Sequence, residues 1–186
     1  MTRHFNKHIE GIDLSFWHEL IESHGELVTL SRGDLVCHVG QPTNKIGYVK
    51  SGYLIYTVVG VGKIGGFTFP DALFGDYPNC LHNLPARFDI MAGRKTEAWI
   101  MDATVLLSLY KDSPVVNQQG HRFAEAAYNS LIDRYCSFIA GGPLERYMEL
   151  IRQHPQIEQD VPQKEIAEYL RITPTHLSRL RRDLLK

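Results

Sequence analysis

Cysteine is scarce in this chain of 186 residues, which contains only Cys37, Cys80 and Cys136. The three lie far apart, without the two-residue spacing that redox and metal sites use. An odd, scattered count fits reduced thiols better than a disulfide framework. The cysteines therefore predict a cytoplasmic protein and argue against a zinc or iron–sulfur site.

Long apolar runs and an excess of one charge are also missing. No segment approaches the length of a membrane span, and the N-terminus lacks the charged and apolar regions of a secretory signal. Lys and Arg number 20 against 21 Asp and Glu, so the whole chain is not a polycation. Any affinity for nucleic acid must come from a local basic segment, and residues 171–186 are the dense one.

Catalytic patterns are absent as well. The chain has no nucleophile elbow, phosphate-binding loop or paired carboxylates, which predicts that it is not an enzyme and carries no cofactor. Its nine histidines keep one alternative open, a cupin-like metal-dependent enzyme. No His-x-His pair occurs among them, so we expect no metal site.

The first two thirds of the chain favour a small helix followed by a β domain. Asp13 can cap a helix over residues 13–24 with one apolar face. Short β-rich runs separated by turn residues then recur, which favours an antiparallel barrel or roll. The runs are residues 27–30, 35–39, 46–49, 53–59, 66–69, 87–91, 96–100 and 104–109.

A long helix is predicted over residues 114–140. Spacings of four, three, four and three form the a/d seam of a coiled coil, made by Ala124, Tyr128, Leu131, Tyr135 and Phe138. Two interpretations stay open: the seam packs on the chain's own barrel, or it joins two chains. The second is favoured because the helix is long and lies between two domains. Gly141 and Gly142 then form a hinge, and Pro143 begins a further helix.

The last two dozen residues have the pattern of a helix-turn-helix. A first helix over residues 163–170 buries its apolar residues Ile166, Ala167 and Leu170. Arg171 stands in the turn, where the backbone is often left-handed and a residue other than glycine costs on the order of 1 kcal/mol. Thr173 suits the N-cap of the second helix, and Pro174 suits its first position.

Apolar and polar side chains separate onto opposite faces of this second helix, at about 100° per residue. Leu177, Leu180 and Leu184 share the inward face. An arginine fork can bond two acceptors of guanine at once, so Arg179 is the expected base contact and Arg182 a phosphate contact. The predicted DNA-binding residues are Thr173, Thr175, His176, Ser178, Arg179, Arg182 and Lys186.

The order of barrel, long helix and helix-turn-helix resembles the Crp/Fnr superfamily of bacterial transcription regulators. The likeness covers nearly the whole chain and is carried by Gly40-Gln41 with residues 46–52 (IGYVKSG), by residues 73–76 (LFGD) and by residues 165–179. It implies an α+β fold: a β-roll or jelly-roll effector domain over residues 1–113, a dimerisation helix over 114–140 and a DNA-binding domain over 141–186.

The same resemblance implies partners. It predicts a homodimer that places each recognition helix in a major groove of double-stranded DNA, with half-sites roughly 34 Å apart. RNA polymerase and an unidentified small-molecule effector are further candidate partners, and no membrane is involved. The oxygen-sensing branch of the family holds an iron–sulfur cluster on cysteines near its N-terminus, whereas residues 1–30 here contain none.

The nucleotide cassette of the family is altered in this chain. Relatives that bind cyclic nucleotides carry a Phe-Gly-Glu-Leu element and then an Arg-Ser pair, and that pair falls here on Phe88 and Asp89. Arg87 is one residue out of place, and such a slip sends a strand side chain to the opposite face. Asp89 would also repel a phosphate. We therefore expect no high-affinity binding of cyclic AMP.

Two alternatives stay open for the barrel. It holds a pocket for an effector, or it is a purely structural module whose aromatic side chains fill that space. The residues that would surround an effector are Phe74, Gly75, Asp76, Tyr77, Arg87, Phe88 and Asp89.

Overall fold

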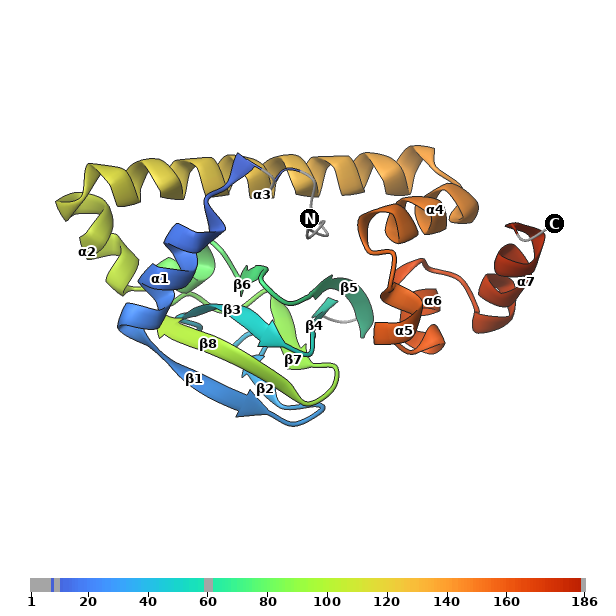
Figure 1. The fold of residues 1–186 in the computed structure, drawn as a ribbon, viewed down its shortest axis with the longest axis horizontal. Coiled ribbons are helices and arrows are strands. Elements are labelled where there is room, and N and C mark those ends of the chain that lie inside the picture. Colours follow the sequence, from blue (N-terminus) through green and yellow to red (C-terminus); the bar gives the residue numbers. More distant parts are fainter. Residues whose placement is uncertain (1–7, 9–10, 59–61, 185–186) are drawn as a thin grey trace. The chain divides into compact units, whose positions relative to one another are not determined.

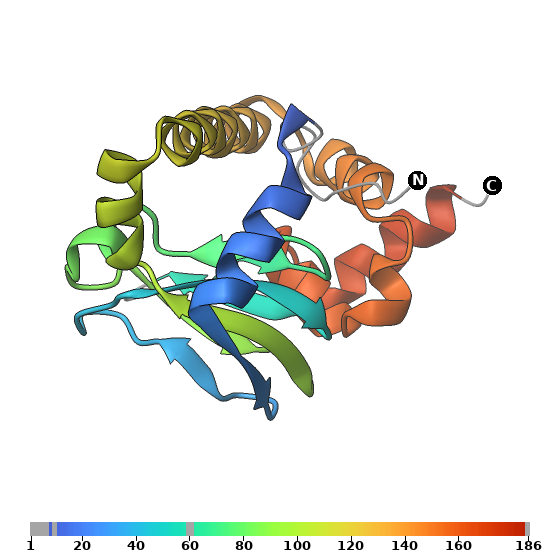
Figure 2. The same cartoon turned by 60° about the vertical axis from the view of Figure 1, so that its left-hand side comes forward.

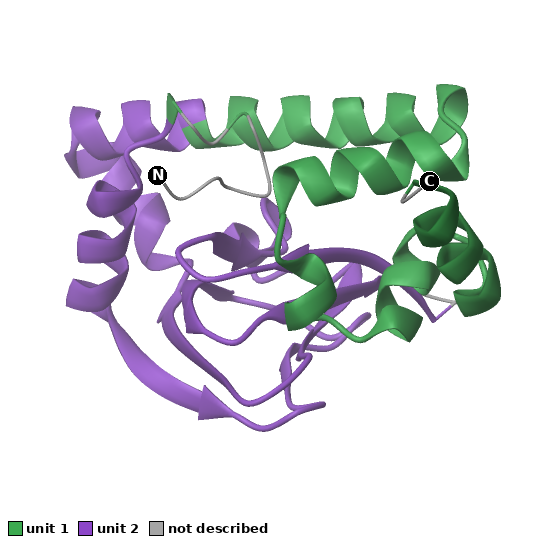
Figure 3. Cartoon of the chain, turned by 45° about the vertical axis from the view of Figure 1, so that its right-hand side comes forward, with its two compact units in different colours: residues 1–11, 123–186 green, residues 12–122 purple. Residues whose placement is uncertain are grey.

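The computed structural model describes residue 8 and residues 11–58 and 62–184. Their contacts divide the chain into two compact units, which are coloured separately in Figure 3. Residues 12–122 hold the strands, and residues 1–11 with 123–186 hold the later part of the long helix and the C-terminal helices. The predicted α+β class and antiparallel β-roll are confirmed.

Two antiparallel sheets make up the β-roll, and the described residues contribute four strands to each (Figure 1). The first sheet has the order β1-β8-β3-β6 and the second the order β2-β7-β4-β5. The strands are β1 (Gly25–Leu30), β2 (Leu35–Cys37), β3 (Lys45–Ser51), β4 (Leu54–Val58), β5 (Lys63–Thr68), β6 (Leu73–Gly75), β7 (Phe88–Ala92) and β8 (Thr96–Asp102).

Side chains from both sheets form the core of the roll. The buried cluster is Cys37, Val49, Leu54, Phe74, Ala86, Ile90, Ala92 and Ala98. Gly47 of β3 has no room for a side chain, because a β-carbon there would lie 2.0 Å from the Trp99 carbonyl oxygen. Gly52 follows β3 with a φ of 85°, which glycine adopts without strain. These two constraints explain both glycines of the IGYVKSG stretch.

Helix α1 (Leu14–His24) covers the first sheet, where it packs against β1, β3 and β8 (Figure 2). Asp13 caps it as predicted, because its carboxylate accepts the Phe16 amide at 3.1 Å. Trp17 and Ile21 are the buried residues of its apolar face. A short 3-10 helix, η2 (Asn79–His82), lies between β6 and β7.

The prediction of a strand at residues 104–109 is wrong, because most of this segment forms the start of a helix, α2 (Val105–Asp112). The Asp102 carboxylate accepts the hydroxyl of Thr104 at 2.7 Å and its amide at 2.9 Å, in the turn that leads into the helix. The hydroxyl bond is the main cause that lowers the pKa of Asp102. Short apolar runs fit both helix and strand, and the prediction missed this turn.

The remaining helices follow the predicted order, except for a short helix over residues 157–160 that was not predicted. Helix α3 (Pro114–Ala140) has the predicted bounds, and α4 (Pro143–Gln153) begins at the predicted proline. They are followed by α5 (Ile157–Asp160), α6 (Gln163–Tyr169) and α7 (Pro174–Leu184). None of the described helices has the length and apolarity needed to cross a membrane.

Candidate nucleic-acid interface and barrel cassette

The turn between α6 and α7 has the geometry that the helix-turn-helix pattern predicts. Arg171 adopts a φ of 61°, in the left-handed region. Its amide donates to the Glu168 carbonyl at 3.1 Å, and the Ile172 amide donates to the Ala167 carbonyl at 3.0 Å. These bonds satisfy the carbonyls at the end of α6. They offset the strain of about 1 kcal/mol that a non-glycine residue carries here.

The second helix begins as predicted. The Thr173 hydroxyl accepts the His176 amide at 3.1 Å, which is an N-cap, and Pro174 is the first helical residue. Four apolar residues of the motif are buried as expected: Ile166, Ala167, Leu170 and Leu177. Leu180 is half-buried. Leu184 departs from the expected inward face, because it is 45% exposed one turn beyond Leu180.

The polar face of α7 is open. The side chains predicted to contact DNA are exposed at every described position, namely Thr173, Thr175, His176, Ser178, Arg179 and Arg182. Lys186 lies outside the described residues. Arg179 has no hydrogen bond or ion pair with any residue that the structure describes. Arg182 has a long ion pair with its neighbour Asp183, with 3.9 Å between Nε and the carboxylate oxygen. Both guanidinium groups can therefore bind an external acceptor.

Ser178 has a second role that the sequence did not indicate. Its hydroxyl accepts a hydrogen bond from the Gln163 side chain at 2.9 Å and donates to the Pro174 carbonyl at 3.0 Å. Ser178 thus ties the start of α6 to the first half of α7. A DNA contact by this hydroxyl has to use its remaining acceptor capacity.

Arg181 differs from its basic neighbours because Glu158 of α5 binds it. Its Nε and Nη2 atoms lie 2.7 and 2.9 Å from the two carboxylate oxygens of Glu158. Tyr147 of α4 donates to the same carboxylate. Neither Glu158 nor Gln163 was singled out from the sequence, because each meets its partner across helices at no characteristic spacing.

The predicted seam of α3 is mostly exposed. Tyr128, Leu131 and Tyr135 are each 63% exposed, and Ala124 is half-buried. Exposed Ile132 and Ile139 widen this apolar surface, which we call the α3 stripe: Tyr128, Leu131, Ile132, Tyr135 and Ile139. Large apolar side chains in one exposed row mark an interaction surface more often than an ordinary face of a monomer.

Phe138, like Ala124, is a predicted seam residue that does not lie in the stripe. It is half-buried, and its ring lies against the guanidinium of Arg146, a residue of α4. Arg134 lies on the same side, with its guanidinium 4.5 Å from the centre of the Tyr169 ring. Burial lowers the pKa of Arg134. Two cation–π contacts therefore connect α3 with the helices that follow it.

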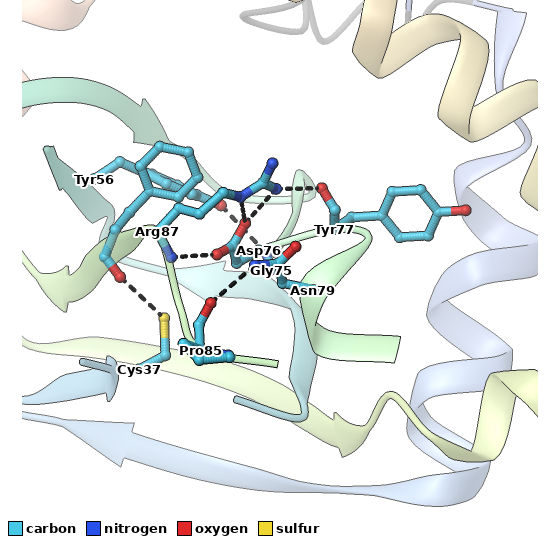
Figure 4. Close-up of polar contacts among 9 residues, drawn as sticks. Cys37, Tyr56, Gly75, Asp76, Tyr77, Asn79, Pro85 and Arg87 are labelled. Carbon is cyan, nitrogen blue, oxygen red and sulfur yellow. Dashed lines mark hydrogen bonds and ion pairs between the residues drawn. The ribbon is translucent and has the colours of Figure 1, made fainter. Parts of the chain in front are cut away.

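The barrel cassette is organised around a buried carboxylate (Figure 4). The Asp76 side chain is 0% exposed and accepts three hydrogen bonds from Arg87: from Nε at 2.8 Å, from Nη2 at 2.5 Å and from the backbone amide at 2.6 Å. Arg87 Nη2 also donates to the Tyr77 carbonyl at 2.8 Å. The arginine fork is therefore occupied by an internal anion.

The expectation that Arg87 points away from the cassette is wrong. Strand β7 begins at Phe88, so the alternation of side chains along that strand does not set the direction of Arg87. Its guanidinium instead folds back over Asp76 and lies 5.5 Å from the centre of the Phe88 ring. Asp89 accepts the Val39 amide at 2.8 Å and contacts His38 at 2.6 Å.

The other cassette residues are packed within the roll. Phe74 is buried, and Gly75 has a φ of 152°. The Gly75 amide donates to the Tyr56 hydroxyl at 3.3 Å, and burial raises the pKa of Tyr56 to about 12. Among residues 8, 11–58 and 62–184, no three His, Cys, Asp or Glu side chains gather in a way that could hold a metal ion.

Comparison with known proteins finds likeness in structure and not in sequence. No family model and no curated protein sequence matches the chain. FixK2 from Bradyrhizobium japonicum is 16% identical with a TM-score of 0.71, and the match covers 86% of this chain and 84% of that one. A CooA mutant from Carboxydothermus hydrogenoformans is 14% identical with a TM-score of 0.67, over 98% and 84%.

A third similar structure carries the family name. It is a transcriptional regulator of the Crp/Fnr family from Eubacterium rectale, 19% identical with a TM-score of 0.66, and the match covers 90% of this chain and 81% of that one. The three matches cover between 86% and 98% of this chain. The chain therefore has the fold of the Crp/Fnr regulators.

Proposed function

We propose that this chain is a sequence-specific DNA-binding transcription regulator that acts as a homodimer. The observation that carries the proposal is the open face of α7, with Arg179 and Arg182 exposed beside Thr175. The chain's net charge is only −1, so this local basic face supplies the attraction to DNA. Arg179 is assigned to a base edge, and Arg182 to a phosphate.

The α3 stripe is the proposed dimer contact. A helix of 27 residues is about 40 Å long, enough for two copies to pair over several heptads. Pairing would cover side chains that a single chain leaves exposed. A two-fold dimer then presents two recognition helices to successive major grooves, roughly 34 Å apart.

Cyclic AMP is not the proposed switch. A cyclic phosphate would have to displace Asp76 from the Arg87 fork and leave a carboxylate buried without its partner, which costs about 2–3 kcal/mol because water reaches Arg87. The full burial of Asp76 and Phe74 favours the alternative in which the barrel is a structural module. Calorimetry that detects saturable, low-micromolar binding of cyclic AMP would overturn this part of the proposal.

The remaining features complete the proposal. The proposed function does not include catalysis. We place the protein in the cytoplasm, where its DNA target would lie. The small, odd number of scattered cysteines supports this placement, because a disulfide framework needs paired cysteines. RNA polymerase stays a predicted partner, through which such a regulator would act on transcription.

Selection of binding sites from genomic fragments tests the proposal directly. The purified full chain is incubated with the fragments, and bound DNA is sequenced with and without added cell metabolites. We expect a motif with two-fold symmetry and half-sites one helical turn apart. Recovery of fragments without any shared motif would contradict sequence-specific binding.

A further inference from the structure

One carboxylate joins three helices of the C-terminal unit. Glu158 of α5 receives the Arg181 fork of α7 in a bidentate ion pair, with distances of 2.7 and 2.9 Å. The same carboxylate accepts the hydroxyl of Tyr147 from α4. Tyr147 is buried. Its burial is the main cause that raises the pKa of its hydroxyl, and the bond to Glu158 is the second. The hydroxyl therefore stays protonated and donates at neutral pH.

Apolar packing of α7 weakens toward its C-terminal end. Leu177 is buried, Leu180 is half-buried and Leu184 is exposed. The bond from Gln163 to Ser178 also acts on the first half. Toward the C-terminal end of α7, the pair with Glu158 supplies the restraint. A planar fork held by two bonds resists rotation of the helix about its axis.

We propose that Glu158 is a positioning residue that fixes the rotation of α7, and that Arg181 is its clamp and not a phosphate contact. This inference rests on the proposed function of α7 as the helix that reads DNA. At about 100° per residue, Arg181 lies nearly opposite Arg179. Loss of the clamp therefore lets Arg179 move away from its base while the basic side chains stay exposed. Specific binding weakens, and non-specific binding does not.

Glu158→Gln, Arg181→Gln and the double variant test the proposal. Fluorescence anisotropy measures their affinity for the selected duplex and for a random duplex at several salt concentrations. On the selected duplex we expect each to bind about tenfold more weakly, as for one impaired base contact, with no further loss in the double variant. On random DNA, Glu158→Gln removes a negative charge and releases Arg181, so it binds equally well or more tightly.

Arg182→Gln is the matched control, because Arg182 is an exposed neighbour without the clamp. It should weaken binding to both duplexes alike and reduce the salt slope by about one. The same signature in Arg181→Gln would identify Arg181 as a phosphate contact and overturn the proposal. An unchanged ratio of specific to non-specific affinity in Glu158→Gln would overturn it too.

If Glu158→Gln loses helix content by circular dichroism, Tyr147→Phe tests the positioning role of Glu158 in its place. This variant keeps the buried ring and removes only the hydroxyl that Glu158 accepts. We expect about a threefold loss of specific affinity, in keeping with one hydrogen bond, and no loss on random DNA. An unchanged specific affinity contradicts the proposal. Failure of the proposed function is distinguishable, because the wild-type chain would then show no preference for any duplex.

Discussion

The guanidinium of Arg146 lies 4.9 Å from the centre of the Phe138 ring, and Phe138 is half-buried at this contact, next to the exposed row on α3. The same guanidinium donates to the carbonyls of Gly141 at 2.7 Å and Leu170 at 3.2 Å. One side chain of α4 thus holds the end of α3, the hinge and the end of α6. Ile139, which is 67% exposed, takes the place in the α3 stripe that the heptad pattern gave to Phe138.

Leu131→Asp should convert the dimer into a monomer. The substitution places a charge in the middle of the α3 stripe, where pairing would bury it without a partner. Sedimentation velocity measures the change in mass, and affinity for the selected duplex should fall with it because two linked recognition helices become one. Asn129→Asp adds the same charge at an exposed position outside the stripe, and it should stay dimeric. A dimeric Leu131→Asp chain would contradict the assigned interface.

Arg179→Ala should cost about 1–3 kcal/mol on the selected duplex and relax the preference at one base pair. Arg182→Ala should instead weaken specific and random DNA alike, and reduce the salt slope by about one. Anisotropy titrations over a range of salt separate the two effects. Equal losses on both kinds of DNA in both variants would show that this division of roles is wrong.

Arg87→Ala should destabilise the β-roll by about 2–3 kcal/mol. It leaves Asp76 buried without its charged partner, and the cost is below that of a fully buried pair because water reaches Arg87. Asp76→Asn combined with Arg87→Ala should recover about 1 kcal/mol or more, since no unpaired charge remains. Urea unfolding followed by the fluorescence of Trp17 and Trp99 reports this unit, because the chain's two tryptophans both lie in it. A double variant less stable than Arg87→Ala would contradict the account.

Thiol titration should find one rapidly reacting cysteine in the native chain. Burial is the main cause that raises the pKa of Cys37 to about 11 and that of Cys80 to about 12, so both stay protonated and shielded at pH 8. Cys136 is exposed. An aromatic disulfide reagent should therefore modify one thiol per native chain and three in urea, and Cys136→Ser should remove the fast reaction. Fast modification of that variant would show that the roll is open.

The sequence was informative where local rules govern the structure. Gly141 and Gly142 mark the end of α3, and Thr173 with Pro174 marks the start of α7, because caps and turns depend on neighbouring residues. The partners of Arg87 and Arg181 were not predictable in this way. Each meets a carboxylate on another element, and periodicity carries no information about such contacts. The helix α2 was missed because a short apolar run fits either period.

Binding to a symmetric duplex with altered spacing tests the central claim most directly. Once the selected motif is known, about five base pairs, or half a helical turn, are inserted between its half-sites. The account predicts that affinity falls to the level of a duplex with a single half-site, because the two α7 helices of one dimer no longer face successive major grooves together. Affinity that is unchanged by the insertion would contradict a dimer that reads both half-sites at once.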